Sequence, residues 1–307
     1  MKHFLIYVAA VLLPVLAFFC IGEVLARQVP NSYRYKEEWM ESHHNEVETL
    51  VLGTSHSLAA VKPDMLDKEE FGVAFNLASF WQLLHMDYFL WQKFDCPKLK
   101  TLLLPISYPT LFFEDMETSP SRYRVIYYKL YMGYPAKSLY TNFEFSDMSM
   151  FTRKLRRYIL PPEEPEHDEY GWTTSYRLKK KKQADMADGK EATTHTREDW
   201  EEAVAVAERN YAILQHFADD CKRRNIKLVL FTTPAWHTYR ELVDERQLAK
   251  MHELIARFQQ QNEGVLYFDY LSDPRFVNDD FYNSNHLSDV GAEKFTKILS
   301  HDILANQ

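Results

Sequence analysis

Short apolar runs alternate with longer amphipathic stretches along most of this chain. Five runs read as strands, and their apolar residues are continuous rather than alternating, the pattern of strands buried on both faces of a parallel sheet. These runs are Thr49–Gly53, Val73–Leu77, Thr101–Ile106, Lys227–Thr232 and Val265–Tyr270. Strands that alternate with helices indicate an α/β fold, a three-layer sandwich around a central parallel sheet.

Apolar residues at helical spacing predict the helices. The clearest helix spans Trp200–Cys221, where Thr196 and Asp199 form a near capping box. Ser288 is the expected N-cap of a last helix that ends near Leu304. Further helices are predicted at Arg122–Met132, Met148–Ile159 and about Glu241–Gln260.

The first stretch of the chain differs from the rest because Phe4–Ile21 contains no charged residue. A helix needs about 20 apolar residues to cross the core of a bilayer, so this segment is just long enough to span a membrane. Pro14 is compatible with this, because membrane helices tolerate proline. A cleaved signal peptide is the alternative, with a small-residue site near Ala26, but the apolar run is long for one. We therefore expect an uncleaved, single-pass anchor. Two phenylalanines before Cys20 argue against a lipid anchor.

The domain organisation follows from these patterns. Residues 1–29 form the transmembrane anchor, and residues 30–307 form one α/β domain with a helical and loop insertion at about 110–195. Flanking charges do not decide the orientation, but a long domain after a short N-terminus usually translocates, which places it outside the cytoplasmic membrane. Within the insertion, Pro161–Lys190 reads as an exposed loop. Its basic run Arg177–Lys182 is either solvated or in contact with anionic lipid or glycan.

Charge and motifs exclude several classes of protein. A net charge of −8 argues against a nucleic-acid partner, which requires a basic face. The chain has no Walker loop, no G-x-G-x-x-G and no C-x-x-C pair, so we expect no nucleotide or zinc site and no cofactor. Of its three cysteines, Cys96 and Cys221 each precede a strand, and they are either a disulfide or, as we favour, two buried thiols.

Two short segments at opposite ends of the chain carry the candidate chemistry. The first is L-G-T-S-H-S, Leu52–Ser57, at the end of a strand; the second is F-Y-N-S-N-H-L-S-D-V-G-A, Phe281–Ala292, which leads into the last helix. A serine becomes a useful nucleophile when a positioned base removes its proton. Ser55 or Ser57 taken alone is better explained as a turn residue that ends a strand. Together the segments favour a Ser–His pair for acyl transfer.

Gly53-Thr54-Ser55 with a C-terminal N-x-x-H resembles the SGNH (GDSL-like) hydrolase superfamily. The chain is most similar to its membrane-anchored branch, which includes alginate O-acetylation proteins and the lipoteichoic-acid D-alanylation protein. The resemblance implies that Ser55 is the nucleophile, that its backbone N–H serves the oxyanion hole, and that His286 is the base. The family has aspartate three residues before the histidine, where this chain has Asn283. Asp279, Asp280 and Asp289 are near enough in sequence to substitute.

The resemblance also implies oxyanion donors, but the family's glycine and asparagine are missing here. Backbone N–H groups near Ala78 and Ser79 are the expected replacements for the glycine, and Ser107 or Tyr108 for the asparagine. Asn76 reads either as a donor or as a structural turn residue. Two histidines complete the candidates. His56 either lines the pocket or packs beneath it, and His237 either contacts substrate or packs on the following helix.

The expected function is therefore an extracytoplasmic SGNH-like hydrolase or O-acyltransferase acting on acyl esters of a cell-surface glycan. The resemblance implies a membrane-bound O-acyltransferase as partner. The alternative is a non-catalytic relative that binds such an acyltransferase or its polymer. A third hypothesis is an esterase for small substrates.

Overall fold

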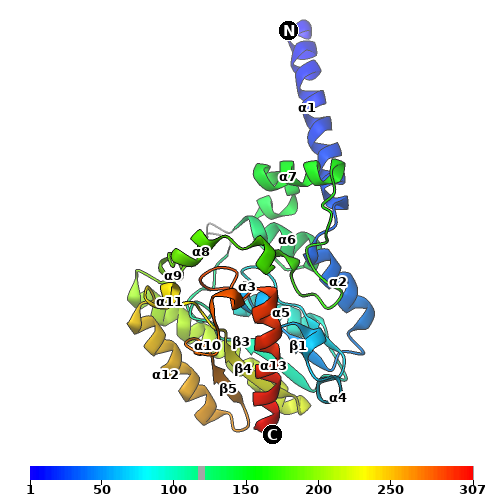
Figure 1. The fold of residues 1–307 in the computed structure, drawn as a ribbon. Coiled ribbons are helices and arrows are strands. Elements are labelled where there is room, and N and C mark those ends of the chain that lie inside the picture. Colours follow the sequence, from blue (N-terminus) through cyan, green and yellow to red (C-terminus); the bar gives the residue numbers. More distant parts are fainter. Residues whose placement is uncertain (117–121, 307) are drawn as a thin grey trace. The chain divides into compact units, whose positions relative to one another are not determined.

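The computed structural model describes residues 1–116 and 122–306 and divides them into two compact units. Unit 1 comprises Met1–Glu37 and Met116–Pro165, and unit 2 comprises Glu38–Asp115 and Glu166–Gln307. Unit 2 holds the sheet, and unit 1 holds the long apolar N-terminal helix (Figure 1).

The fold is α/β, with a central sheet of five parallel strands in the order β2-β1-β3-β4-β5. The strands are β1 (Thr49–Val51), β2 (Ala74–Asn76), β3 (Thr101–Pro105), β4 (Lys227–Thr232) and β5 (Leu266–Asp269). All five predicted runs are therefore strands, each within two residues of its expected bounds. In this doubly wound arrangement the strand order reverses between β1 and β3, and in such sheets ligands bind in the crevice at the carboxyl ends of the strands beside that point.

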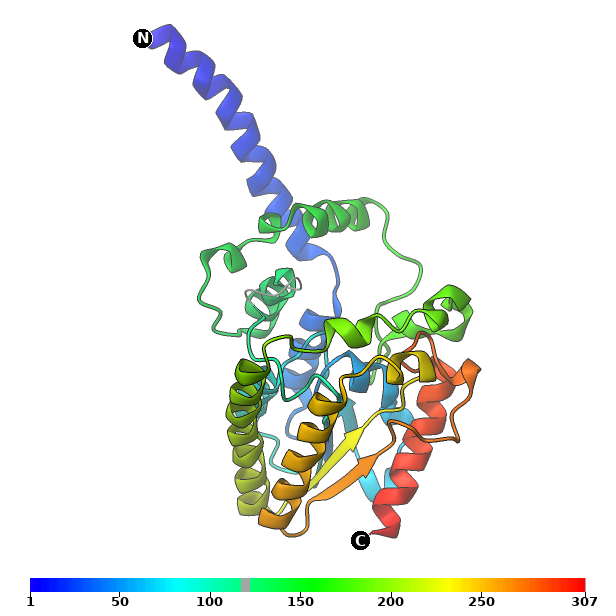
Figure 2. The same cartoon turned by 90° about the vertical axis from the view of Figure 1, so that its left-hand side faces the viewer.

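Helices cover both faces of the sheet in unit 2. One face carries α5 (Leu84–Lys93), α10 (Trp200–Arg224) and α12 (Glu245–Gln261). The other carries α3 (Ser55–Ala60) and α13 (Asp289–Ala305), whose apolar side chains join those of β1, β3 and β4 in one core. In Figure 2 the sheet lies between α10 and α12 on one side and α13 on the other. The remaining helices of unit 2 are α4 (Lys68–Phe71), α8 (Gln183–Ala187), α9 (Glu191–Thr194), α11 (His237–Arg240) and several 3₁₀ turns, with α2 (Ser32–His43) crossing the unit boundary in sequence.

Capping residues explain where the helices begin. Ser288 accepts a hydrogen bond from the backbone N–H of Gly291 and caps α13, as the sequence predicts. At the start of α10 the near capping box does not form: Asp199 is itself the N-cap and accepts the N–H of Glu202, and the Thr196 hydroxyl donates to the carbonyl of Ala192. The stretch from Glu241 was expected as one helix. It is one helix, α12, but it begins four residues later, at Glu245, because the Asp244 side chain caps it by accepting the N–H groups of Arg246 and Gln247; α11 ends before this stretch, at Arg240.

The described residues of unit 1 form α1 (Lys2–Gln28), the first half of α2, α6 (Tyr123–Met132) and α7 (Met148–Ile159), with 3₁₀ turns at Leu139–Asn142 and Glu144–Ser146. α1 is long and apolar enough to cross a membrane, and its side chains are largely exposed along the apolar stretch. α6 and α7 match the two helices predicted inside the insertion.

The prediction that Pro161–Lys190 is an exposed loop is partly wrong. From Glu166 onward it packs on unit 2: Trp172 is buried and donates its indole N–H to the carbonyl of Ala59, and the carbonyl of Tyr170 accepts the N–H of Asn76. The basic run is not fully solvated either, because Lys181 donates to Asn278. Burial of a large aromatic side chain offsets part of the conformational entropy that a loop loses on ordering, and the sequence pattern does not show which aromatic residues find a partner.

Cys96 and Cys221 are buried free thiols, the alternative favoured from the sequence. Burial raises the pKa of each thiol to about 12.

Candidate functional site

Ser55 lies at the carboxyl end of β1, on the turn that enters α3. Thr54 caps α3 by accepting the backbone N–H of His56, so Ser55 is the first residue of that helix. Ser57, two residues on, donates its hydroxyl to the carbonyls of Leu52 and Thr54 and closes the turn. The strand-ending role proposed for either serine thus belongs to Ser57, while the hydroxyl of Ser55 bonds to a distant residue.

The turn depends on Gly53 and on a buried carboxyl group beneath it. Gly53 has φ +108°, and a Cβ atom there would lie 2.1 Å from Cγ of Pro105 at the end of β3. Its N–H donates to Oδ1 of Asp87 at 2.8 Å, and the same oxygen accepts from Nε2 of Gln82 at 2.7 Å. Burial raises the pKa of Asp87 to about 8, against the opposing effect of these two hydrogen bonds.

His286 meets Ser55 across 231 positions of sequence. Its Nε2 lies 2.9 Å from Oγ of Ser55, and its Nδ1 lies 3.0 Å from Oδ1 of Asn283. That oxygen also accepts the backbone N–H groups of His286 at 2.8 Å and of Asn285 at 3.3 Å. These two backbone donors identify the atom facing the ring as the amide oxygen. Nδ1 therefore carries the proton, which leaves Nε2 free to accept from the serine hydroxyl.

Aromatic rings cover both faces of the His286 imidazole. Tyr176 stacks on it with centroids 4.6 Å apart, and His56 stacks at 5.1 Å. His286 is 7 % exposed. Burial, with a smaller repulsive contribution from His195, lowers the pKa of His286 to about 3. At neutral pH the imidazole is an uncharged proton acceptor.

His56 packs beneath the pair instead of lining an open pocket. Its Nδ1 lies 3.1 Å from Oγ of Ser107, and its Nε2 lies 3.4 Å from the side-chain nitrogen of Asn285. Burial, followed by the proximity of His286 and then His195, holds its pKa well below the ordinary value. Ser107 is in turn held by Thr110, whose hydroxyl accepts its backbone N–H. Ser107 thus supports His56.

The backbone donors expected near Ala78 and Ser79 are already engaged. The N–H of Ala78 donates to Oδ1 of Asn76, and that of Ser79 to the carbonyl of Gly53. Asn76 also donates to the carbonyls of Ser57 and Val61, so it is a structural turn residue. The expectation fails because the end of β2 uses these groups to hold the Ser55 turn. The N–H of Ser55 has no acceptor in the described part of the chain.

Tyr108 and His237 have partners of their own. The Tyr108 hydroxyl bonds to Thr196 at 2.7 Å and accepts the N–H of Asp244, which ties it to the start of α12. His237 is exposed and pairs with Glu241 one turn further along the chain. Within the described residues, neither side chain bonds to Ser55 or His286.

None of the three nearby aspartates replaces Asn283. Asp280 accepts the N–H of Val277 and pairs with Lys294, and Asp289 accepts the N–H of Leu178. Asp279 is exposed, with Lys181 at 3.9 Å. The group that orients His286 is uncharged.

Sequence reasoning missed several groups around the pair: Trp81, Asp87, Tyr176, His195 and Asn285. Trp81 has φ +52°, rare for a bulky residue, and its ring meets the edges of His195 and Phe113. His195 bonds through Nδ1 to the hydroxyl of Tyr239 at 2.8 Å, and burial lowers its pKa to about 4. Only Asn285, inside the N-S-N-H motif, carried a local signal.

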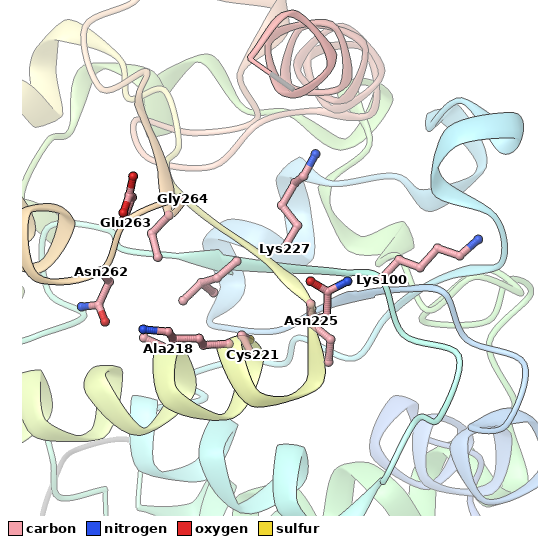
Figure 3. A pocket seen from close by; sticks show the side chains of 12 residues that line it. Lys100, Ala218, Cys221, Asn225, Lys227, Asn262, Glu263 and Gly264 are labelled. Atoms are coloured by element: carbon pink, nitrogen blue, oxygen red, sulfur yellow. The ribbon is translucent and has the colours of Figure 1, made fainter.

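A cavity of about 520 Å³ lies at the amino ends of the strands, opposite the end that carries Ser55 (Figure 3). It is formed where β3, β4 and β5 begin and includes Lys100, Lys222 and Lys227. α10 ends here at its cap Asn225, and α12 ends at Asn262, so two helix carboxyl termini face it. The lysines offset the negative ends of these helices, which is a structural role.

Within the described residues, no group of three or more His, Cys, Asp or Glu side chains is arranged to hold a metal ion.

No protein-family model matches the chain, and no curated protein matches it. Among solved structures, the chain is similar to a crystal structure described as a "putative acylhydrolase" from Bacteroides fragilis NCTC 9343. The sequence identity is 9 % and the TM-score is 0.39, over 87 % of this chain and 95 % of that chain.

Proposed function

We propose that unit 2 processes acyl esters through Ser55 and His286, as an SGNH-like hydrolase or O-acyltransferase. The observation that carries the proposal is the hydrogen bond of 2.9 Å from Oγ of Ser55 to an imidazole whose tautomer Asn283 fixes. Nucleophile, base and orienting group thus form one connected chain, the arrangement that serine acyl transfer requires.

The reaction would proceed in two steps. Oγ of Ser55 attacks the acyl carbonyl while Nε2 of His286 takes the hydroxyl proton, and collapse expels the alcohol, which receives that proton. A hydroxyl of water or of an acceptor then attacks the acyl-serine, with His286 again as base, and releases Ser55. The unengaged N–H of Ser55 would stabilise the oxyanion.

An extracytoplasmic glycan is the substrate class we propose, with a membrane-bound O-acyltransferase as partner. The support is the resemblance of the two motifs to the membrane-anchored branch, together with an apolar helix, α1, able to cross a membrane. In this proposal α1 anchors the chain, and unit 2 faces away from the cytoplasm.

A non-catalytic accessory protein is the second candidate, and one observation favours it. The N–H groups of Ala78 and Ser79 are both engaged, so the oxyanion would rely on fewer donors than the family uses. Loss of a single oxyanion donor typically costs about 10²–10³ in rate. The fold could persist under such a loss as a binding module.

Covalent labelling of the full-length protein by a serine-directed fluorophosphonate separates the two functions. We expect labelling of the wild type, none in Ser55→Ala, and a rate lower by about 10²-fold or more in His286→Ala. Ser272→Ala, which removes an exposed serine in the same unit, should label like the wild type. No labelling of a protein with wild-type circular dichroism and melting would contradict catalysis and favour the accessory role.

A further inference from the structure

The carboxyl-terminal end of α1 packs against α7 within unit 1. Phe151 of α7 lies against Phe18 and Phe19, with ring centroids 6.4 and 6.2 Å away. A Cβ atom on Gly22 would lie 2.6 Å from the Phe151 ring, so only glycine permits this approach. Phe18 and Phe19 are near the end of the uncharged stretch that finishes at Ile21. α7 therefore contacts α1 at the point where the apolar surface of α1 ends.

The last turns of α1 are an integral part of unit 1. Glu23 is 9 % exposed, and its carboxylate accepts the backbone N–H groups of Glu144 and Phe145, which caps the 3₁₀ turn before α7. Arg27 pairs with Glu23 at 2.7 Å and donates to the carbonyl of Asn142. A chain cleaved after Ala26 would lose the Glu23 cap.

α7 presents different chemistry on each side. Lys154 points inward, where it pairs with Glu144 at 2.5 Å with both side chains buried. Next to it Phe151 faces α1. Met148 and Ile159, three helical turns apart on one side, are 48 % and 75 % exposed. Arg153 and Arg156 are exposed on the adjoining side. An exposed apolar stripe beside exposed arginines is the pattern of a helix that lies in a membrane interface.

Both figures show α7 running across the direction of α1 (Figures 1 and 2). A helix across a transmembrane segment, at the end of its apolar stretch, lies parallel to the bilayer surface at the boundary of headgroups and acyl chains. Leu160 directly after α7 is 64 % exposed, and Phe143 before it is 44 % exposed and stacks on Phe145, which contacts Phe19. These side chains extend the apolar surface beside α1.

We propose that α7 is an interfacial helix that seats unit 1 on an anionic lipid bilayer crossed by α1. Ile159 and Leu160 enter the acyl region, and Arg153 and Arg156 bind lipid phosphates. The occupant is lipid because the apolar surface is continuous with α1 and the charge beside it is basic, which complements anionic headgroups. Each basic residue near such a surface contributes on the order of a 5-fold preference for anionic lipid.

Spin labelling tests the interfacial position of α7 by measuring how deep single residues lie in the bilayer. The full-length chain is reconstituted in vesicles of phosphatidylcholine with phosphatidylglycerol. The parent protein carries Cys20→Ala, since Cys20 is exposed while Cys96 and Cys221 are buried. A nitroxide is attached to a single new cysteine in each of three variants. Ile159→Cys is the test site, Ser149→Cys is the matched site on the arginine side of α7, and Glu263→Cys is an exposed site of unit 2. Collision with oxygen reports the acyl region, and collision with a water-soluble nickel complex reports water.

We expect the Ile159→Cys label to collide with oxygen and to be shielded from nickel, and the Ser149→Cys label to be intermediate. The Glu263→Cys label defines full exposure to water. If the Ile159→Cys label is as open to nickel as that reference, the proposal fails. If it is shielded from both reagents, a protein covers α7, and the proposal also fails.

A second arm tests the arginines. The double variant Arg153→Gln, Arg156→Gln should raise the nickel accessibility of the Ile159→Cys label in vesicles with phosphatidylglycerol, and have little effect in phosphatidylcholine alone. An equal effect in both lipids would overturn the phosphate contacts. The outcome does not depend on whether Ser55 is catalytic.

Discussion

The amide oxygen of Asn283 lies 3.0 Å from Nδ1 of His286 and is held there by two backbone N–H groups. In a charged triad an aspartate at this place both orients the imidazole and stabilises the imidazolium. Asparagine performs the first task and not the second, so the site has a fixed base of low basicity.

Replacing Asn283 by aspartate should increase reactivity. The new carboxylate would accept the same backbone N–H groups and would stabilise a protonated His286, the charge that forms as Ser55 attacks. We expect fluorophosphonate labelling at least ~10-fold faster than the wild type, within the ~10⁴ that this exchange changed in one triad. Asn283→Ala, which removes the orienting oxygen, should label more slowly. Equal rates in all three proteins would show that Asn283 does not orient the base.

The labelling rate should persist into acid. Burial lowers the pKa of His286 to about 3, so the neutral base remains at pH values where an ordinary histidine, with a pKa of about 6.5, is protonated. The rate measured against pH should fall only near the lowered pKa. In Asn283→Asp the acid limb should move to higher pH, because the carboxylate stabilises the imidazolium. A wild-type midpoint near 6.5 would contradict the buried, neutral imidazole.

Asp87 should make the protein less stable as pH rises through the neutral range. Its folded pKa is about 8 against 3.8 for a free carboxyl, so between these values the folded state holds a proton that the unfolded state has lost. The free energy of unfolding therefore falls, by up to ~1.4 kcal/mol per pH unit for one proton, until pH exceeds about 8.

Asp87→Asn keeps an oxygen for Gly53 and Gln82 and removes the titration. Urea unfolding at several pH values should show that the variant gains stability relative to the wild type between acid and pH 8. Asp87→Ala should lose stability at every pH and slow the labelling of Ser55, because the N–H of Gly53 is left without its acceptor. A parallel pH dependence in wild type and Asp87→Asn would refute the assignment.

Gly53→Ala should be more damaging than an alanine at another glycine with positive φ. At Gly53 the new Cβ meets Pro105 and the backbone is strained, and we expect a loss of more than ~2 kcal/mol together with loss of labelling. Gly264, at φ +87°, has no atom within 4 Å of such a Cβ, so Gly264→Ala should cost only the strain, about 1 kcal/mol. Equal melting temperatures of the two variants would contradict the close contact with β3.

The mature protein should keep α1. Glu23 caps the turn before α7 and Gly22 fits against Phe151, so the end of α1 completes unit 1. Intact mass spectrometry of protein from the membrane fraction should give the full chain of 36.4 kDa. A shorter chain that begins after Ala26 would identify a signal peptide instead.

The sequence by itself determined the layered fold, because continuous apolar runs and capping residues act locally. All five strands and the cap Ser288 could be predicted, and the apolar run Phe4–Ile21 indicated a helix long enough to span a membrane. Ser55 and His286 could be proposed as a pair because each lies in a short motif next to a strand or helix end.

Only the tertiary structure decided what surrounds that pair. Tyr176 comes from a segment that reads as an exposed loop, and Asp87 from the first turn of a helix, yet one covers His286 and the other holds Gly53. The N–H groups of Ala78 and Ser79, expected as oxyanion donors, bond instead to the Asn76 side chain and to the carbonyl of Gly53. Hydrogen bonds and ring contacts between distant segments depend on which groups meet when the sheet assembles, and residue order does not record that.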